Sequence, residues 1–131
     1  MWLYNNKDIT EDDIKGYVGF VYLIENLDNN MYYIGKKSLK KTKVYQKNKK
    51  KKRMLVESDW KDYTGSNDLL NEHIESGNKI RKTIIRMCRN KTEMSYYEAK
   101  EQFSRDVLLD KNSYNQWIMV RARKSNLMID K

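Results

Sequence analysis

The chain has 131 residues, of which 39% are hydrophobic and 34% charged, and its net charge is +9. This length suits one domain with a single core, and no apolar run approaches the roughly 20 residues of a membrane span. The chain starts with neither the basic nor the apolar stretch of a signal peptide, so we expect an intracellular, cytoplasmic protein. Cys88 and His73 are the only residues of their kinds, which excludes an intramolecular disulfide and a Cys/His zinc finger.

The positive charge is concentrated in one segment. Residues 36–53 contain eleven basic side chains and no acidic one, whereas the rest of the chain has 16 basic and 18 acidic residues. A local excess of this kind is typical of a surface that binds polyphosphates, although a solvated, disordered lysine tract is the commoner outcome for charge runs. Membrane binding is disfavoured because the tract lacks an interleaved apolar face. We therefore expect a nucleic acid as the partner.

Alternation of apolar residues predicts a β-hairpin in the first third of the chain. Residues 19–26 are rich in β-branched and aromatic side chains, an Asn-rich turn follows, and residues 31–35 form the second strand. The basic segment beyond Gly35 has little apolar content before Met54, and we predict a long loop or a polar helix there.

Further elements are expected in the middle of the chain. Residues 58–66 predict an ordered connection whose aromatic side chains dock on the core. A short helix is expected over residues 68–76, capped by Ser66 or Asn67. Residues 79–88 alternate strictly, which predicts a third strand with basic side chains on both faces.

A second helix is expected from Glu93 to about Leu109, with Thr92 as its N-cap. Apolar residues recur at helical spacing along it and predict its buried stripe. These are Tyr96, Ala99, Phe103 and Val107. Residues 114–120 after this helix are apolar enough to pack back onto the domain.

The predicted fold class is α+β, a three-stranded antiparallel β-sheet flanked by helices. We expect one domain over residues 1–131. It comprises an amino-terminal extension at 1–18, a basic insertion at 36–56 and a carboxy-terminal tail at 116–131.

Two tyrosines on the predicted hairpin lie eleven residues apart, Tyr22 on its first strand and Tyr33 on its second. Cross-strand packing is the simpler explanation for them. The stretch GFVYLIENLDNNMYYIG nevertheless resembles the GIY-YIG nuclease domain. Phe20-Val21-Tyr22 stands where that family has Gly-Ile-Tyr, and Tyr33-Ile34-Gly35 matches its second triplet unchanged. The resemblance covers most of the chain and is closest to small, phage-type, homing-endonuclease-like members.

The resemblance implies a metal-dependent DNA endonuclease with a GIY-YIG fold. It gives Tyr22 the role of general base or water-positioning group, and Tyr33 a hydrogen bond to the phosphate or the attacking water. Glu98 is implied as the ligand of a Mg²⁺ (or Mn²⁺) ion, with Glu101 as the fallback, and Asn115 as a supporting residue. Such an ion lowers the pKa of bound water and offsets phosphate charge. A phenol with a pKa of about 10 can act as a base only if nearby cations depress that pKa.

The chain departs from the family pattern at the basic residue that follows the second triplet. Family members carry an arginine on the helix after the second triplet, but Lys43 stands about ten residues beyond Tyr33, and Arg53 is the first arginine. Lysine lacks the bidentate fork of arginine, so we favour Arg53 for this role. The open alternatives are Lys36, Lys37 and Lys43. The family's histidine on that helix has no match, because His73 falls on the next predicted helix and is expected to be exposed or half-buried.

The lysine-rich segment is the predicted DNA-binding surface. Its members are Lys36, Lys37, Lys43, Lys49, Lys50, Lys51 and Lys52. A rival hypothesis is a catalytically inactive nucleic-acid-binding protein on the same scaffold, with Trp60 or Tyr63 for stacking. A third is an interaction protein whose basic loop binds an acidic partner.

The chain offers little room for a second, DNA-reading domain, since 16 residues follow Asn115. We therefore expect low intrinsic specificity, or specificity supplied by a homodimer or a protein partner. A phage-encoded protein would act in the host cytoplasm.

Overall fold

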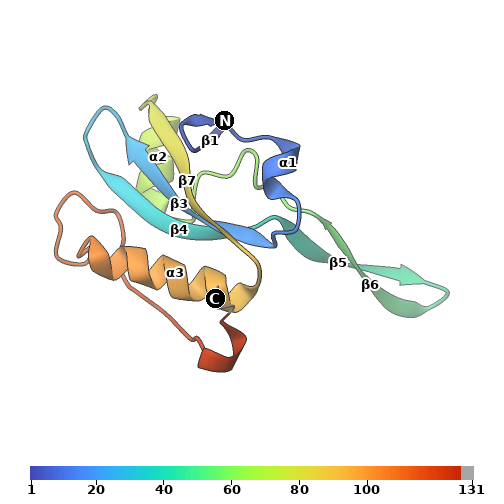
Figure 1. The fold of residues 1–131 in the computed structure, drawn as a ribbon. Coiled ribbons are helices and arrows are strands. Elements are labelled where there is room, and N and C mark those ends of the chain that lie inside the picture. Colours follow the sequence, from blue (N-terminus) through green and yellow to red (C-terminus); the bar gives the residue numbers. More distant parts are fainter. Residues whose placement is uncertain (128–131) are drawn as a thin grey trace.

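The computed structural model describes residues 1–127 and has an α+β fold (Figure 1). Its main sheet is mixed and has five strands in the order β2-β1-β7-β3-β4, so the prediction of a three-stranded antiparallel sheet was wrong in strand number and in the direction of one strand pair. β1 runs parallel to β7, and the other neighbouring strands of this sheet are antiparallel. The strands are β1 (Trp2–Tyr4), β2 (Lys7–Asp8), β3 (Gly19–Asn26), β4 (Tyr32–Ser38) and β7 (Ile80–Cys88).

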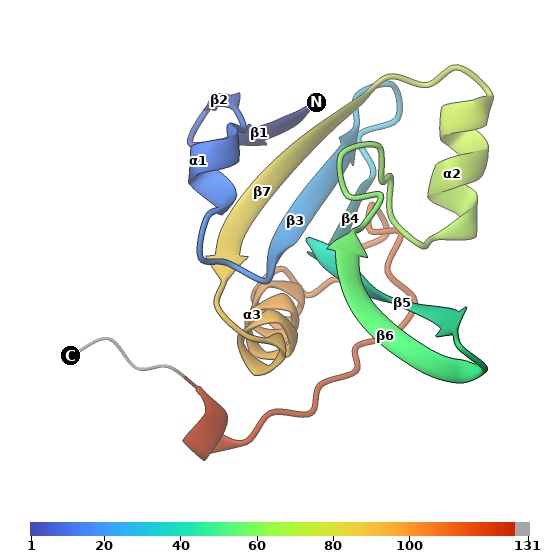
Figure 2. The same cartoon turned by 90° about the vertical axis from the view of Figure 1, so that its right-hand side faces the viewer.

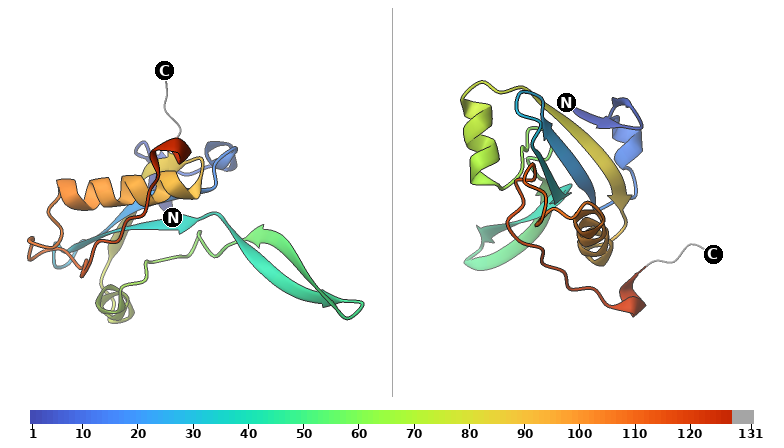
Figure 3. Two further views of the ribbon diagram at one scale, coloured as in Figure 1. Left: turned by 90° about the horizontal axis from the view of Figure 1, so that it is seen from below. Right: turned by 90° about the vertical axis from the view of Figure 1, so that its left-hand side faces the viewer.

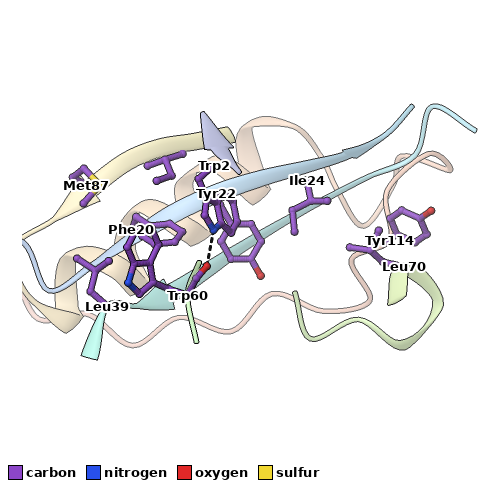
Figure 4. Packing of buried hydrophobic residues seen from close by; sticks show 10 residues of the cluster. Trp2, Phe20, Tyr22, Ile24, Leu39, Trp60, Leu70, Met87 and Tyr114 are labelled. Carbon is purple, nitrogen blue, oxygen red and sulfur yellow. Dashed lines mark hydrogen bonds between the residues drawn. The ribbon is translucent and has the colours of Figure 1, made fainter. Parts of the chain in front are cut away.

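The two additional strands come from residues 1–18, which the sequence suggested as an extension. Trp2 is fully buried, and its Nε1 donates a hydrogen bond to the carbonyl oxygen of Trp60 at 2.6 Å (Figure 4). Helix α1 (Glu11–Ile14) follows, with Thr10 as its N-cap. Strands of three and two residues are too short for an alternation pattern, so periodicity could not reveal them.

The hairpin of β3 and β4 confirms the sequence prediction. Its turn is built by asparagine side chains: Asn26 Oδ1 accepts from the amide of Asp28, and Asn29 Oδ1 accepts from the amide of Met31. Asn30 has a φ of 62°, a left-handed conformation that asparagine tolerates.

The basic segment is a second hairpin, so the prediction of a loop or polar helix was wrong. Strands β5 (Lys40–Lys47) and β6 (Lys50–Glu57) pair along their full length. Asn48 and Lys49 at the turn have φ values of 53° and 60°, as a tight two-residue hairpin turn requires. This hairpin projects away from the main sheet, and all its strand residues except the half-buried Val56 are exposed (Figures 1 and 3).

Strand β7 is confirmed as a strand, but its strict alternation is interrupted. The register against β3 shifts at Val21 and Tyr22, because Val21 pairs with Arg86 and Tyr22 pairs with Ile84. The bulge moves Arg86 to the α3 side, where its guanidinium lies 3.7 Å from the centroid of the Tyr97 ring.

The core has two parts, one on each face of the main sheet. One part contains Phe20, Tyr22 and Leu70, the last from helix α2 (Asp68–Glu75), and Figure 4 shows its packing. The other contains Val21 and Met94, the latter from helix α3 (Lys91–Ser104). The two helices therefore cover opposite faces of the sheet (Figures 2 and 3).

Helix α2 and the connection before it were predicted correctly. Asn67, one of the two expected caps, accepts a hydrogen bond from the amide of Leu70 at 2.9 Å. Trp60 of the connection is buried, and Tyr63 packs against the core.

Helix α3 differs from its prediction in both bounds and buried face. Its N-cap is Asn90 rather than Thr92, and it ends at Ser104 rather than near Leu109. Ala99 and Val107 are buried as expected, but Tyr96 is 38% and Phe103 60% exposed.

Polar side chains occupy much of the buried face of α3. Glu93 forms an ion pair with Arg89 at 2.9 Å, and Gln102 Nε2 donates to the carbonyl oxygen of Ile34 at 3.2 Å. A pattern of apolar residues cannot predict a face that is buried through polar contacts.

The segment after α3 returns along the free edge of β4. Tyr32 donates its amide hydrogen to Asn112 O, and Tyr114 donates its amide hydrogen to Tyr32 O. The prediction that residues 114–120 pack back is right for Tyr114 but wrong for Met119, which is exposed.

A short 3₁₀ helix, η1 (Lys124–Asn126), ends the described part. The last four residues of the predicted tail, 128–131, lie outside the described residues. Within residues 1–127, none of the helices is long and apolar enough to cross a membrane.

Candidate active site

A cavity of about 640 Å³ lies at the outer edge of β4. Its walls come from β3, β4, the start of α2, one side of α3 and residues 115–119. Five side chains that the sequence singled out line this cavity, although they are up to 93 positions apart in the chain. They are Tyr22, Tyr33, Lys36, Glu98 and Asn115.

The Tyr22 hydroxyl occupies space left by two glycines. Gly35 lies opposite Tyr22 in the β3–β4 register, and a Cβ atom added at Gly35 would collide with the hydroxyl oxygen of Tyr22. A Cβ at Gly65, whose φ is +86°, would lie 3.4 Å from that same oxygen. The Tyr22 hydroxyl thus fills the space that a side chain at Gly35 would need, which explains why the second triplet ends in glycine.

Both tyrosines are protonated in this environment at neutral pH. Burial raises the pKa of Tyr22 well above its usual value, and the neighbouring Tyr33, Tyr63 and Glu98 raise it further. Burial also raises the pKa of Tyr33, against a lowering by the hydrogen bond to Ser66. That bond joins Tyr33 Oη and Ser66 Oγ at 3.2 Å. A protonated phenol can orient a water molecule, whereas acting as a base requires an added positive charge to lower its pKa.

Glu98 and Lys36 form the charged part of the cavity. Lys36 Nζ lies 3.9 Å from Glu98 Oε1 and donates a hydrogen bond to Ser95 Oγ at 2.9 Å. Burial raises the pKa of Glu98, and the charge and backbone of Lys36 lower it in part. Glu98 thus has a desolvation cost that a further cation in the cavity would reduce.

Gln102 also lines the cavity, one helical turn after Glu98. Its Nε2 is bonded to Ile34, while its Oε1 is buried and has no hydrogen-bond partner within the described residues. No cluster of three or more His, Cys, Asp or Glu side chains suited to a metal occurs in residues 1–127. One carboxylate and one free amide oxygen fit an ion such as Mg²⁺, which keeps several of its waters.

Asn115 binds the edge of β4 at two points. Its Oδ1 accepts from the amide of Ile34 at 3.0 Å, and its Nδ2 donates to the carbonyl of Ile34 at 2.8 Å. At Ile34, between Tyr33 and Gly35, the Asn115 side chain thereby makes the two backbone hydrogen bonds that a neighbouring strand would make. This contact gives Asn115 a positioning role for the second triplet.

Several predicted site residues lie away from the cavity lining. Arg53 is exposed on β6, opposite Val44, and Lys43 is on β5. Lys37 forms an ion pair with Asp59 at 2.6 Å. Of the four candidate cations, only Lys36 lines the cavity.

Glu101 and His73 have partners of their own. Glu101, the fallback ligand, pairs with Arg105 at 3.3 Å. His73 is half-buried as expected, and its Nδ1 lies 2.7 Å from the Tyr114 hydroxyl.

The β5–β6 hairpin has two unequal faces, because directly paired residues of antiparallel strands point to the same side. One face, named here the lysine face, holds five lysines and no acidic residue. They are Lys41, Lys43, Lys47, Lys50 and Lys52. The opposite face holds three cations, Lys40, Lys51 and Arg53, together with Glu57. The predicted lysines 49–52 are therefore divided between the turn and the two faces.

The sequence reasoning missed part of the cavity wall. Gln102 and Leu69 were not singled out, and Trp117 and Met119 fell in a segment that was expected to pack back onto the domain. The signal for Gln102 was its place four residues after Glu98 on one helix.

Comparison with known families agrees with this geometry. Residues 2–118 match the family model described as "Putative endonuclease segE, GIY-YIG domain". The chain belongs to the GIY-YIG nuclease family. No curated protein and no solved structure matches it.

The match places this GIY-YIG domain among endonucleases, whose substrate is DNA. It also includes the β5–β6 hairpin and β1. Both triplets of the GIY-YIG pattern lie on paired strands, with Tyr22 directly opposite Gly35.

Proposed function

We propose that the protein is a metal-dependent DNA endonuclease that hydrolyses phosphodiester bonds in the cavity beside β4. The observation that carries the proposal is the convergence of Tyr22, Tyr33, Lys36 and Glu98 on one cavity. Membership of the GIY-YIG family supports the same reaction class. The projecting basic hairpin supports a polyanionic substrate.

Glu98 is the proposed ligand of a Mg²⁺ or Mn²⁺ ion, which it would hold together with the unpartnered Oε1 of Gln102. Such an ion supplies positive charge that acidifies water and offsets the charge of the scissile phosphate. The unpartnered oxygen of Gln102 and the desolvated carboxylate of Glu98 support this assignment.

The remaining steps belong to side chains of the chain itself. The Tyr22 hydroxyl orients the attacking water, since burial raises the pKa of this phenol well above its usual value. Tyr33 gives up its hydrogen bond with Ser66 and donates a hydrogen bond to a phosphate oxygen instead. Lys36 takes the part of the family's arginine, and as a point charge it neutralises the phosphate without bidentate contact.

The lysine face of the hairpin is the proposed duplex-binding surface. A two-stranded ribbon fits the major groove of B-DNA, and each lysine there neutralises phosphate charge. Lys47 and Lys50 are directly paired across the strands, and like charges at such positions repel each other. A polyanion relieves this repulsion, whereas Glu57 partly offsets the charge of the opposite face.

Incubation of plasmid DNA with the protein and Mg²⁺ or Mn²⁺ tests the proposal. We expect cleavage by the wild type and by Glu101→Gln, and loss of cleavage in Glu98→Gln. The two variants remove the same charge from the same helix, but only Glu98 lines the cavity. Cleavage by Glu98→Gln at the wild-type rate would refute the proposed site. Binding without cleavage by the wild type in both metals would instead establish an inactive DNA-binding protein on this scaffold.

A further inference from the structure

An exposed tryptophan lies at the rim of the candidate active site. Trp117 lines the cavity and is 70% exposed, whereas Trp2 and Trp60 are 0% and 3% exposed. Leu69 and Met119 are further exposed apolar side chains of the same lining. The cavity therefore combines a polar, charged part at Glu98 and Lys36 with an apolar rim.

The backbone around Trp117 is held on both sides. Asn115 makes two hydrogen bonds to Ile34, and Asn67 Nδ2 donates to the carbonyl of Tyr114 at 2.9 Å. On the other side, Ile118 packs against the core part next to α3. Trp117 is thus held between two anchored residues, and its exposure is a property of the folded segment.

We propose that Trp117, supported by Leu69 and Met119, stacks on an unstacked nucleobase next to the phosphodiester bond that is cut. The inference rests on the proposed endonuclease function and deepens it. A nucleobase has an apolar π-face for the indole ring and a phosphate within reach of the charged part of the same cavity. The basic residues Arg121 and Arg123 that follow are exposed and favour a polyanion over a neutral partner.

This subsite selects for DNA in which a base has left its stack. In a regular duplex both faces of each base are already covered by its neighbours, so stacking on Trp117 requires unstacking. That cost is lowest at a mismatch, a bulge or a single-stranded segment. The protein therefore binds a duplex with one unpaired base more tightly than the fully paired duplex of the same length.

Metal-free binding measurements test the subsite without any cleavage. Equal-length duplexes with and without one bulged base are titrated in EDTA with the wild type, Trp117→Ala, Trp117→Phe and Leu109→Ala. Leu109 is an exposed apolar residue outside the cavity lining and serves as the control. We expect Trp117→Ala to weaken binding of the bulged duplex by about 5- to 150-fold, with Trp117→Phe intermediate and Leu109→Ala unchanged. Binding of the paired duplex should be the same in all four proteins.

Tryptophan fluorescence gives an independent measurement, because Trp117 is the accessible tryptophan among the three. Acrylamide should quench it in the free protein, and the bulged duplex should protect it more than the paired duplex does. Equal affinities of wild type and Trp117→Ala for the bulged duplex would refute the proposal. Protection that rises with protein concentration without DNA would also refute it, since a second copy of the chain would then cover Trp117. Failure of the nuclease assay would leave these binding results intact, so the two proposals fail separately.

Discussion

The unequal faces of the β5–β6 hairpin allow a charge-matched test of DNA binding. One triple variant changes Lys43, Lys50 and Lys52 of the lysine face to Gln. The other changes Lys40, Lys51 and Arg53 of the opposite face to Gln. Both remove three positive charges from the same two strands, so they have the same effect on net charge and differ in the face that loses it.

The expected difference follows from counterion release. Each cation that neutralises a duplex phosphate contributes about 0.9 to the slope of log affinity against log salt concentration. Loss of three contacts on the lysine face should flatten that slope by about 2.7, whereas the opposite-face variant should change it by less than about 0.9. Between about 50 and 200 mM salt, wild-type binding should then weaken about 40-fold more than binding by the lysine-face variant.

Fluorescence anisotropy of a labelled duplex in EDTA measures both slopes without cleavage. Circular dichroism and thermal unfolding establish that both variants keep the fold, which we expect because the six changed side chains are exposed. Equal flattening by the two variants would show that the hairpin acts as a diffuse positive charge. A larger effect of the opposite-face variant would refute the assignment of the lysine face and would favour a DNA contact for Arg53.

Three further predictions concern the cavity. Tyr22→Phe keeps the ring and removes the hydroxyl that orients the attacking water, so turnover at saturating DNA should fall by a factor on the order of 10² with little change in thermal stability. Glu98 has a raised pKa, so the folded protein binds its proton more tightly than the unfolded chain does, and stability from this group is lost as pH rises through the raised pKa. The melting temperature of metal-free Glu98→Gln relative to wild type should therefore increase from acid to neutral pH. Gly35→Ala places a methyl group against the Tyr22 hydroxyl and should lower the free energy of unfolding by about 1–3 kcal/mol in urea titrations.

Each of these predictions has an outcome that contradicts it. Full turnover of Tyr22→Phe would make the phenol structural only. A melting-temperature difference for Glu98→Gln that is independent of pH would contradict the raised pKa. Gly35→Ala should be less damaging in a Tyr22→Phe background, because that change removes the hydroxyl oxygen, one of the two Tyr22 atoms that collide with the added methyl group. Strict additivity of the two changes would show that the hydroxyl oxygen contributes nothing to the collision.

The first hairpin and its two tyrosines were accessible from sequence because local signals determine them. β3 and β4 alternate between two buried faces, and the asparagine turn makes its own hydrogen bonds, so periodicity and turn chemistry agree. Tyr22 and Tyr33 were found through their spacing in the sequence. The hairpin brings the two side chains together, with ring centroids 6.2 Å apart.

The second hairpin was missed because its strands are exposed on both faces. Alternation reports the difference between a buried and a solvated side, and β5 and β6 have no buried side. The available signal was the turn, since Asn48 begins a two-residue left-handed turn between Val44-Tyr45 and Met54-Leu55-Val56. Because the hairpin was not recognised, the sequence could not show that Arg53 lies away from the cavity. It therefore could not show that Lys36 is the candidate cation that lines it.

The buried face of α3 was missed for a different reason. Glu93 is buried with its ion-pair partner Arg89, and Gln102 is buried with its hydrogen bond to Ile34. A hydropathy pattern cannot reveal either of these polar contacts. The bulge in β7 is likewise a tertiary feature, which exchanges the faces of Arg86 and Met87 relative to strict alternation.

The pairing of β1 with β7 has a consequence for how the molecule is made. Trp2 pairs with Lys82, and Ile34 receives the side chain of Asn115, so both closures join segments about 80 positions apart. During synthesis from the amino terminus, neither closure can form before the later partner has left the ribosome. Folds dominated by such distant pairings assemble slowly compared with helical domains. The wall of the cavity that includes Glu98 and Asn115 is completed last, so the nascent chain has no assembled site until nearly all of the matched domain has been translated.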